Sequence, residues 1–178
     1  MKDIFDDSMG IAESILVTLF EMGRLLPLPL EAPNEWVRRQ RRLSQRQYSN
    51  SFQNLKRRGM IKVVQKNNRK FIEVTSEGQL EVLLLKTALE KPKKWDNKWR
   101  LFMFDIPEDS KEKRFQLRGL LKKNNFVLLQ GSVYVSPYPL NREGIEYLKR
   151  SGLDRYIKIA KVEEFDDDTE IKKKFGLS

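Results

Sequence analysis

The sequence predicts an α+β protein in two parts, and three observations support this. Helical segments followed by a basic hairpin are readable before residue 75. From residue 99 onward, short apolar strands alternate with helical segments. Between them lies Lys91-Pro-Lys-Lys94, a short, basic, proline-bearing stretch typical of a linker. We therefore expect domains at 1–90 and 99–178, joined by a basic linker at 91–98.

The first part is predicted to open with an amphipathic helix over 11–20 that ends near Gly23. Its apolar positions recur at helical spacing: Ile11, Ile15, Leu16, Leu19 and Phe20. The run Leu-Pro-Leu-Pro-Leu at 26–30 cannot continue a helix and is predicted to be a connector. A short second helix is expected over 31–40, anchored by Trp36.

A third helix is predicted to begin after Ser44, a good N-cap residue, and to end at Gly59. Tyr48, Phe52 and Leu55 form one apolar stripe along it. The opposite face carries Arg, Gln, Asn and Ser side chains without an acid. Such side chains can contact base edges and phosphates in a major groove.

Two strands, 60–64 and 70–74, are predicted to flank a five-residue connection at 65–69 that contains Asn67 and Asn68. Helix, helix, helix and then a basic hairpin is the order of a winged helix-turn-helix. A further helix is expected to start at Thr75-Ser-Glu-Gly78, with an apolar face of leucines.

The second part is predicted to have the β-α-β-β-α-β order of a ferredoxin-like domain. Pro107 is expected in the first turn of its first helix. The expected ranges are strand 99–104, helix 108–123, strands 126–129 and 132–135, helix 141–150, strand 156–162 and a closing amphipathic piece at 171–175.

The amino-acid composition excludes several classes of function and favours others. Lys and Arg number 35 against 25 Asp and Glu, which gives a net charge of +10 and points to a polyanionic partner, nucleic acid first. The absence of Cys and His excludes disulfides, iron–sulfur clusters, the usual zinc sites and a Ser-His-Asp triad. No segment is long enough to span a bilayer and the acidic N-terminus lacks signal-peptide features, so we expect a cytoplasmic protein without a membrane partner.

The basic excess is concentrated where the recognition helix and hairpin are predicted. Residues 36–72 hold twelve basic residues and no acid. We expect double-stranded DNA to contact Arg41, Arg42, Gln45, Arg46, Gln47, Ser49, Asn50, Gln53, Asn54, Arg57, Arg58, Lys66, Asn67, Asn68 and Arg69. The acidic run at 163–170 is more typical of a solvated face than of a metal site.

Several motifs of the second part resemble the central domain of the PaaX-like transcriptional repressors. They are Trp95-Asp-Asn-Lys-Trp-Arg-Leu-Phe-Met-Phe-Asp-Ile-Pro-Glu108, then Arg114, Leu117-Arg118 and Leu121, then Asn125-Phe126, then Leu129-Gln-Gly-Ser-Val-Tyr-Val-Ser-Pro137, and Lys172-Lys-Lys-Phe-Gly-Leu177. That domain is similar to the small ferredoxin-like protein of CRISPR adaptation. In that family an Asp at the end of the first strand is the proposed Mg²⁺-binding nuclease residue, and two subunits face each other. Asp105 occupies that position.

The resemblance implies a homodimeric, sequence-specific regulator of transcription, with repression as the expected effect, no cofactor and an unidentified small-molecule effector. The alternative is a metal-dependent nuclease, or a nucleic-acid-binding protein of the adaptation type, that uses Asp105 and Mg²⁺. Asp105 also has a structural interpretation, as a helix cap or as a partner of Arg114 and Arg118. A third hypothesis is a non-specific nucleic-acid adaptor that docks a partner through Trp95 and Trp99, unless both pack at the domain junction.

Overall fold

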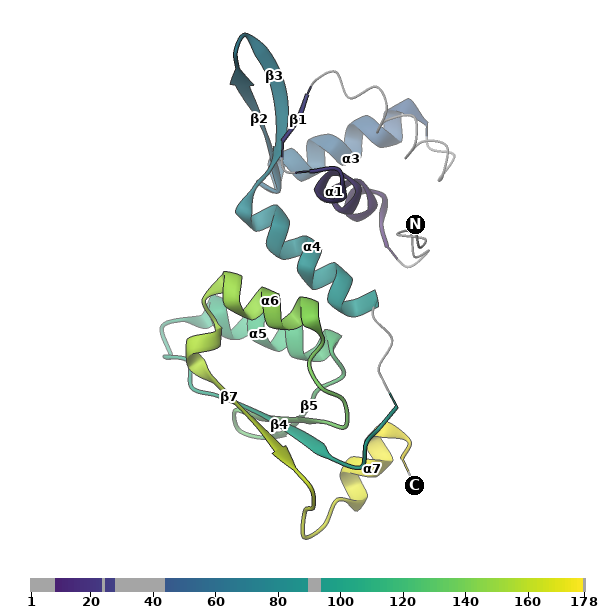
Figure 1. Cartoon of the computed structure of the whole chain (residues 1–178), viewed down its shortest axis with the longest axis vertical. Helices are drawn as coiled ribbons and strands as arrows, with labels where there is room; N and C mark the ends of the chain where they lie inside the picture. The colour runs from purple at the N-terminus through teal and green to yellow at the C-terminus, as the bar shows by residue number, and fades with distance from the viewer. Residues whose placement is uncertain (1–8, 24, 28–43, 90–93, 178) are drawn as a thin grey trace. The chain divides into compact units, whose positions relative to one another are not determined.

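The computed structural model describes residues 9–23, 25–27, 44–89 and 94–177. The chain divides into two compact units, Met1–Leu85 and Lys86–Ser178. Each unit combines helices with its own antiparallel sheet (Figure 1), so the predicted α+β class is confirmed. Among the described residues, no helix is both long enough and apolar enough to cross a bilayer.

The first unit follows the predicted order of helices and hairpin wherever the structure describes it. The predicted second helix at 31–40 lies outside the described residues. The last four residues of the final helix already belong to the second unit. The elements in chain order are α1 (Ile11–Glu21), β1 (Leu25–Pro27), α3 (Gln45–Arg57), β2 (Ile61–Lys66), β3 (Arg69–Val74) and α4 (Ser76–Leu89).

Strand β1 corrects the prediction of a plain connector at 26–30. Its residues pair antiparallel with β3, with Leu25 opposite Glu73 and Pro27 opposite Phe71, in a sheet of order β1-β3-β2. A proline is tolerated because β1 is the edge strand, where one side of the backbone needs no ladder hydrogen bond. The pairing partners lie more than forty residues away in sequence, so local proline content alone was misleading.

The core of the first unit forms where α1 and α3 meet the sheet, around fully buried Leu16, Leu55 and Ile72. The start of α4 is fixed to the same sheet by a close approach. The Gly78 N–H donates to the Thr75 hydroxyl over 3.1 Å. A Cβ at Gly78 would lie 2.1 Å from the Met60 carbonyl oxygen. Glycine, which has no Cβ, is therefore the residue that this close contact accommodates.

The second unit confirms the predicted β-α-β-β-α-β order. Its four-stranded antiparallel sheet has the order β5-β6-β4-β7, the ferredoxin-like arrangement. Helices α5 and α6 lie together on one face of this sheet in Figure 1. The elements are β4 (Trp99–Phe104), α5 (Lys111–Lys123), β5 (Val127–Gln130), β6 (Val133–Ser136), α6 (Arg142–Ser151), the 3-10 turn η1 (Asp154–Tyr156), β7 (Ile157–Val162) and α7 (Thr169–Phe175).

Helix α5 begins three residues later than predicted. The Ser110 N–H donates to the Pro107 carbonyl over 3.0 Å, which closes a turn, and the helix starts only at Lys111. Pro107 therefore precedes the helix instead of occupying its first turn. The Arg114 guanidinium donates twice to the Ile106 carbonyl, at 3.0 and 2.7 Å, and so ties α5 to the chain that enters it.

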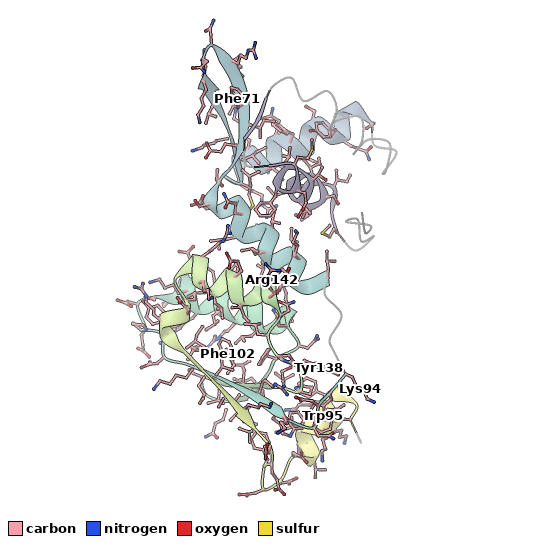
Figure 2. The ribbon with its side chains drawn as sticks, in the orientation of Figure 1. Phe71, Lys94, Trp95, Phe102, Tyr138 and Arg142 are labelled. Carbon is pink, nitrogen blue, oxygen red and sulfur yellow. The ribbon has the colours of Figure 1, made fainter. Side chains whose placement is uncertain are left out.

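Alternate residues of β4 point to opposite faces of the sheet and supply two cores. On the helix-covered face, Phe102 is fully buried and meets Phe126 edge-on, with ring centroids 5.7 Å apart. On the other face, Trp99 packs with Ile171 and Phe175 of α7. Figure 2 labels Phe102 and Trp95, which lie in these two cores. The closing amphipathic piece predicted at 171–175 lies in helix α7, which packs on this unit.

Candidate nucleic-acid interface

The first turn of α3 is fixed by a capping box, which confirms Ser44 as the predicted N-cap. The Gln47 N–H donates to the Ser44 hydroxyl over 3.2 Å, and the Ser44 N–H donates to the Gln47 side-chain oxygen over 2.9 Å. This pairing uses the Gln47 oxygen for the cap, although Gln47 was predicted to contact DNA. The Ser-x-x-Gln spacing is the sequence signal for this role.

The apolar stripe of α3 faces the core of the first unit. Tyr48 and Leu55 are buried, and the Tyr48 and Phe52 rings stack with centroids 6.4 Å apart. Burial raises the pKa of Tyr48 to about 12, because the phenolate would lose its hydration. The stripe therefore determines which face of α3 remains exposed.

The exposed face of α3 is polar, cationic and grooved. Helix α3 contains no acidic residue, and Arg46, Ser49, Asn50, Gln53 and Arg57 are exposed along it. An open groove of about 520 Å³ is lined by Asn50, Gln53, Asn54 and Arg57. Amide and guanidinium side chains in one groove provide both donors and acceptors for the edges of bases.

Arg58 differs from its neighbours, because its charge is already paired. Its guanidinium lies 3.2 Å from the Glu13 carboxylate in α1 and 3.4 Å from that of Glu81 in α4. These contacts lie within the first unit and connect three of its helices. The sequence placed Arg58 with the DNA-contacting residues, but the structure engages it in holding the unit together.

Three other predicted contacts have no described side chain. Arg41 and Arg42 lie outside the described residues, and for Gln45 the structure describes only the backbone, as the first residue of α3.

The hairpin has a tighter tip than predicted. Strands β2 and β3 pair up to Lys66 opposite Arg69, so the turn consists of Asn67 and Asn68 alone instead of residues 65–69. Both asparagines have positive φ, 48° and 59°, as a two-residue type I′ turn requires. All four tip residues are exposed, and the side-chain amide of Gln65 donates to that of Asn68 over 3.4 Å.

The candidate residues thus form two groups. One is the groove of α3, and the other is the tip of the hairpin, which contributes no residue to that groove. At the tip, Lys66 and Arg69 face each other in register and place two positive charges at the end of the ribbon. Farther down the ribbon, the Lys62 ammonium lies 3.4 Å from the Glu73 carboxylate and is therefore already paired.

Asp105, the residue of the nuclease alternative, is exposed at the end of β4. Its N–H donates to the Tyr156 carbonyl over 3.0 Å. The predicted pairing of Asp105 with Arg114 is wrong, because the Arg114 guanidinium is used by the Ile106 carbonyl. Among the ion pairs that the structure describes, Arg118 is not a partner of Asp105 either.

Beside Asp105 lies a cationic cluster that no sequence signal revealed. The Lys113 ammonium donates to the Tyr156 hydroxyl over 3.3 Å and the Arg155 guanidinium lies 4.9 Å from the centre of the Tyr156 ring. The Lys113 hydrogen bond, together with the positive charges of Arg155 and Lys113, lowers the pKa of Tyr156. Lys113 and Tyr156 are 43 residues apart, so only the fold brings them together.

Trp99 is buried in the core of the second unit, and Trp95 is partly buried against it. Their ring centroids lie 5.1 Å apart, and Trp99 is 1% exposed. Both side chains donate within this unit, Trp95 to the Lys98 carbonyl and Trp99 to the Asp168 carboxylate. Both rings pack near α7 within one unit, so their packing is internal to the second unit and not at a domain junction.

Comparison with known families agrees with this architecture. Residues 92–173 match the family described as the PaaX protein central Cas2-like domain. The matched range contains the four strands of the sheet and helices α5 and α6. No curated protein matches the chain. The ferredoxin-like unit is thus similar to the central Cas2-like domain of the PaaX protein.

Proposed function

We propose that the chain is a transcriptional regulator that binds double-stranded DNA sequence-specifically, with repression as its effect. The observation that carries this proposal is the acid-free groove of α3, where Asn50, Gln53, Asn54 and Arg57 converge. The presence of a PaaX-type domain in the second unit supports a role in transcription regulation.

In this proposal the first unit is a winged helix-turn-helix. Helix α3 is the recognition helix, because its buried stripe turns the polar groove outward and its capping box fixes its first turn. A B-DNA major groove is about 12 Å wide and admits one α-helix with its side chains. Hairpin β2–β3 is the wing, and its exposed tip carries charge suited to a phosphate or a minor groove.

The two groups of residues have different tasks. Asn50 and Gln53 carry amides, which pair with adenine in two-pronged contacts, and the Arg57 fork suits guanine or a phosphate. Lys66 and Arg69 at the tip contribute charge, which raises affinity without reading sequence. Specificity therefore arises in the groove of α3, and a large share of the salt dependence arises at the hairpin.

We further propose that the protein acts as a homodimer through residues 99–178. Two recognition helices that read half-sites about 34 Å apart gain affinity because the second contact becomes intramolecular. Light scattering of the full chain at tens of micromolar is expected to give twice the 21.1 kDa chain mass. A monomer mass would contradict this part of the proposal.

The decisive experiment is selection of sheared genomic DNA by the purified protein at about 150 mM salt, where weak phosphate-only binding is suppressed. Mg²⁺ is included, and both bound and cleaved fragments are sequenced. We expect a few sharply enriched, roughly palindromic sites, uncut. The Arg46→Ala, Asn50→Ala, Arg57→Ala triple variant is expected to lose this enrichment.

The matched control is Arg142→Ala, which removes an exposed arginine from α6 of the second unit and is expected to leave the enriched sites unchanged. If the unaltered protein recovers all fragments equally, the result would favour the non-specific adaptor. Cleavage that requires Mg²⁺ and disappears in Asp105→Asn would favour the nuclease.

A further inference from the structure

An open pocket of about 420 Å³ lies in the second unit, where strand β4 ends and its antiparallel partner β7 begins. Phe104 and Ile157 form part of its apolar wall, and Asp105, Arg155, Tyr156 and Lys158 bring polar groups to it. Ligand pockets commonly have this volume range and this combination of an apolar wall with a few convergent polar groups.

Positive charge dominates the pocket. Arg155 and Lys158 are exposed, and Asp105 is the single carboxylate among the lining residues. None of these three forms a salt bridge in the part of the chain that the structure describes. The two cations outnumber the one carboxylate and are available to a ligand, and a concave wall concentrates their field.

Tyr156 links the pocket to a third cation. Its hydroxyl accepts a hydrogen bond from Lys113 of α5 over 3.3 Å, and the same ammonium lies 5.3 Å from the ring centre. Because the hydroxyl oxygen accepts from Lys113, its own proton remains free to donate. Tyr156 can therefore present an O–H donor to an anion, with two cations beside its ring.

These residues do not fit a divalent cation, which the resemblance to the CRISPR adaptation protein implies for Asp105. Mg²⁺ requires six oxygen ligands and is usually bound through one or two carboxylates together with substrate phosphates. Asp105 stands alone among cations, and the described residues contain no group of three side chains that could hold a metal ion. Arg155 and Lys158 would repel a divalent cation at this place.

We propose that this pocket binds a phosphate group, held by Arg155, Lys158 and the Tyr156 hydroxyl, with the apolar wall beside it accommodating the organic part of the ligand. The proposal goes beyond the DNA-binding role of the first unit and does not depend on it. The phosphate belongs either to a small phosphorylated molecule or to a nucleic-acid backbone, because both offer the same oxygens to the same donors.

The test follows backbone amide signals of the ¹⁵N-labelled full chain by NMR during titration with inorganic phosphate. We expect saturable shifts at Asp105, Tyr156 and Lys158, which sodium chloride at equal ionic strength does not produce. The double variant Arg155→Gln, Lys158→Gln is expected to weaken phosphate binding about tenfold or more, since it removes two charge-assisted contacts. Lys161→Gln, an exposed change on the same strand outside the pocket, is the matched control and is expected to bind normally.

Unchanged signals elsewhere in the spectrum of the double variant show that it is folded. A second titration uses short duplex DNA. Shifts of the same amides with DNA assign the phosphate to a nucleic-acid backbone, whereas shifts with free phosphate alone assign it to a small ligand, and both results support the pocket.

Two results would overturn the proposal. One is the absence of saturable shifts up to about 50 mM phosphate, well above the millimolar affinity of a site with few contacts. The other is selective broadening of the Asp105 signal by Mn²⁺ that Asp105→Asn removes, in a protein that does not respond to phosphate. That result would restore the metal site.

Discussion

The Arg58 guanidinium donates to the Glu13 carboxylate over 3.2 Å and thereby ties the end of α3 to the start of α1. Its neighbour Arg57 lines the polar groove instead. Two adjacent arginines, the last residue of α3 and its C-cap, thus have different surroundings. This pair offers a direct test of which side chains bind DNA and which stabilise the fold.

Arg57→Ala is expected to lower affinity for a selected operator by about 1–3 kcal/mol, the cost of a lost base-reading contact. Arg58→Ala is expected to leave operator affinity nearly unchanged. It should lower the free energy of unfolding by at most about 1 kcal/mol, because its ion pairs are partly exposed and screened by solvent. Fluorescence anisotropy and urea denaturation measure the two quantities. Equal losses of operator affinity in the two variants would show that the groove does not define the interface.

Lys66→Gln and Arg69→Gln are each expected to reduce the slope of log affinity against log salt by about one, because each removes one phosphate contact. The loss should be the same for operator and random DNA. Lys62→Gln, in the same hairpin, is the control, since Lys62 is paired with Glu73. Affinity measured at several salt concentrations gives the slopes, and an unchanged slope in both tip variants would remove the hairpin from the interface.

The two-residue turn makes a prediction about stability. Asn68→Ala is expected to lower the free energy of unfolding by about 1 kcal/mol, because alanine is strained at positive φ. Asn68→Gly is expected to retain or slightly raise it, since Asn-Gly suits a type I′ turn. Urea denaturation of both variants measures the effect. Identical stabilities would mean that the turn does not hold this geometry in solution.

Because Tyr48 is buried, we expect the free energy of unfolding to fall at alkaline pH. Its pKa is raised from 10.0 to about 12 in the folded chain, so the neutral phenol is favoured by folding. The contribution is complete below pH 10 and is lost as pH rises from 10 to 12, and its size is about 2 kcal/mol. In Tyr48→Phe the free energy of unfolding should therefore fall less steeply over this range. Parallel curves for the two proteins would contradict a buried phenol.

Local sequence signals were enough for much of the first unit. The cap at Ser44, the stripe of Tyr48 and Leu55 and the hairpin at Asn67 all depend on residues close together in sequence, and each was predicted. Strand β1 was missed because its pairing with β3 is decided by residues far along the chain.

The candidate site likewise has some features that local sequence predicts and others that depend on residues far apart in sequence. The polar face of α3 is readable from helical spacing alone. By contrast, the ion pair between Arg58 and Glu13 joins residues 45 positions apart, and the Lys113–Tyr156 contact joins two elements across a whole domain. Such contacts are properties of the fold, so charge in the sequence could identify a basic region but not which of its charges are free.

The aromatic core around α7 has a spectroscopic consequence. Two of the three tryptophans of the chain, Trp95 and Trp99, lie in that core. In a Trp36→Phe variant, tryptophan emission would therefore report on the second unit alone, while far-ultraviolet circular dichroism records the helices of both units. If the two signals change at different urea concentrations, the units unfold separately. A single transition temperature for the whole chain would then describe neither unit.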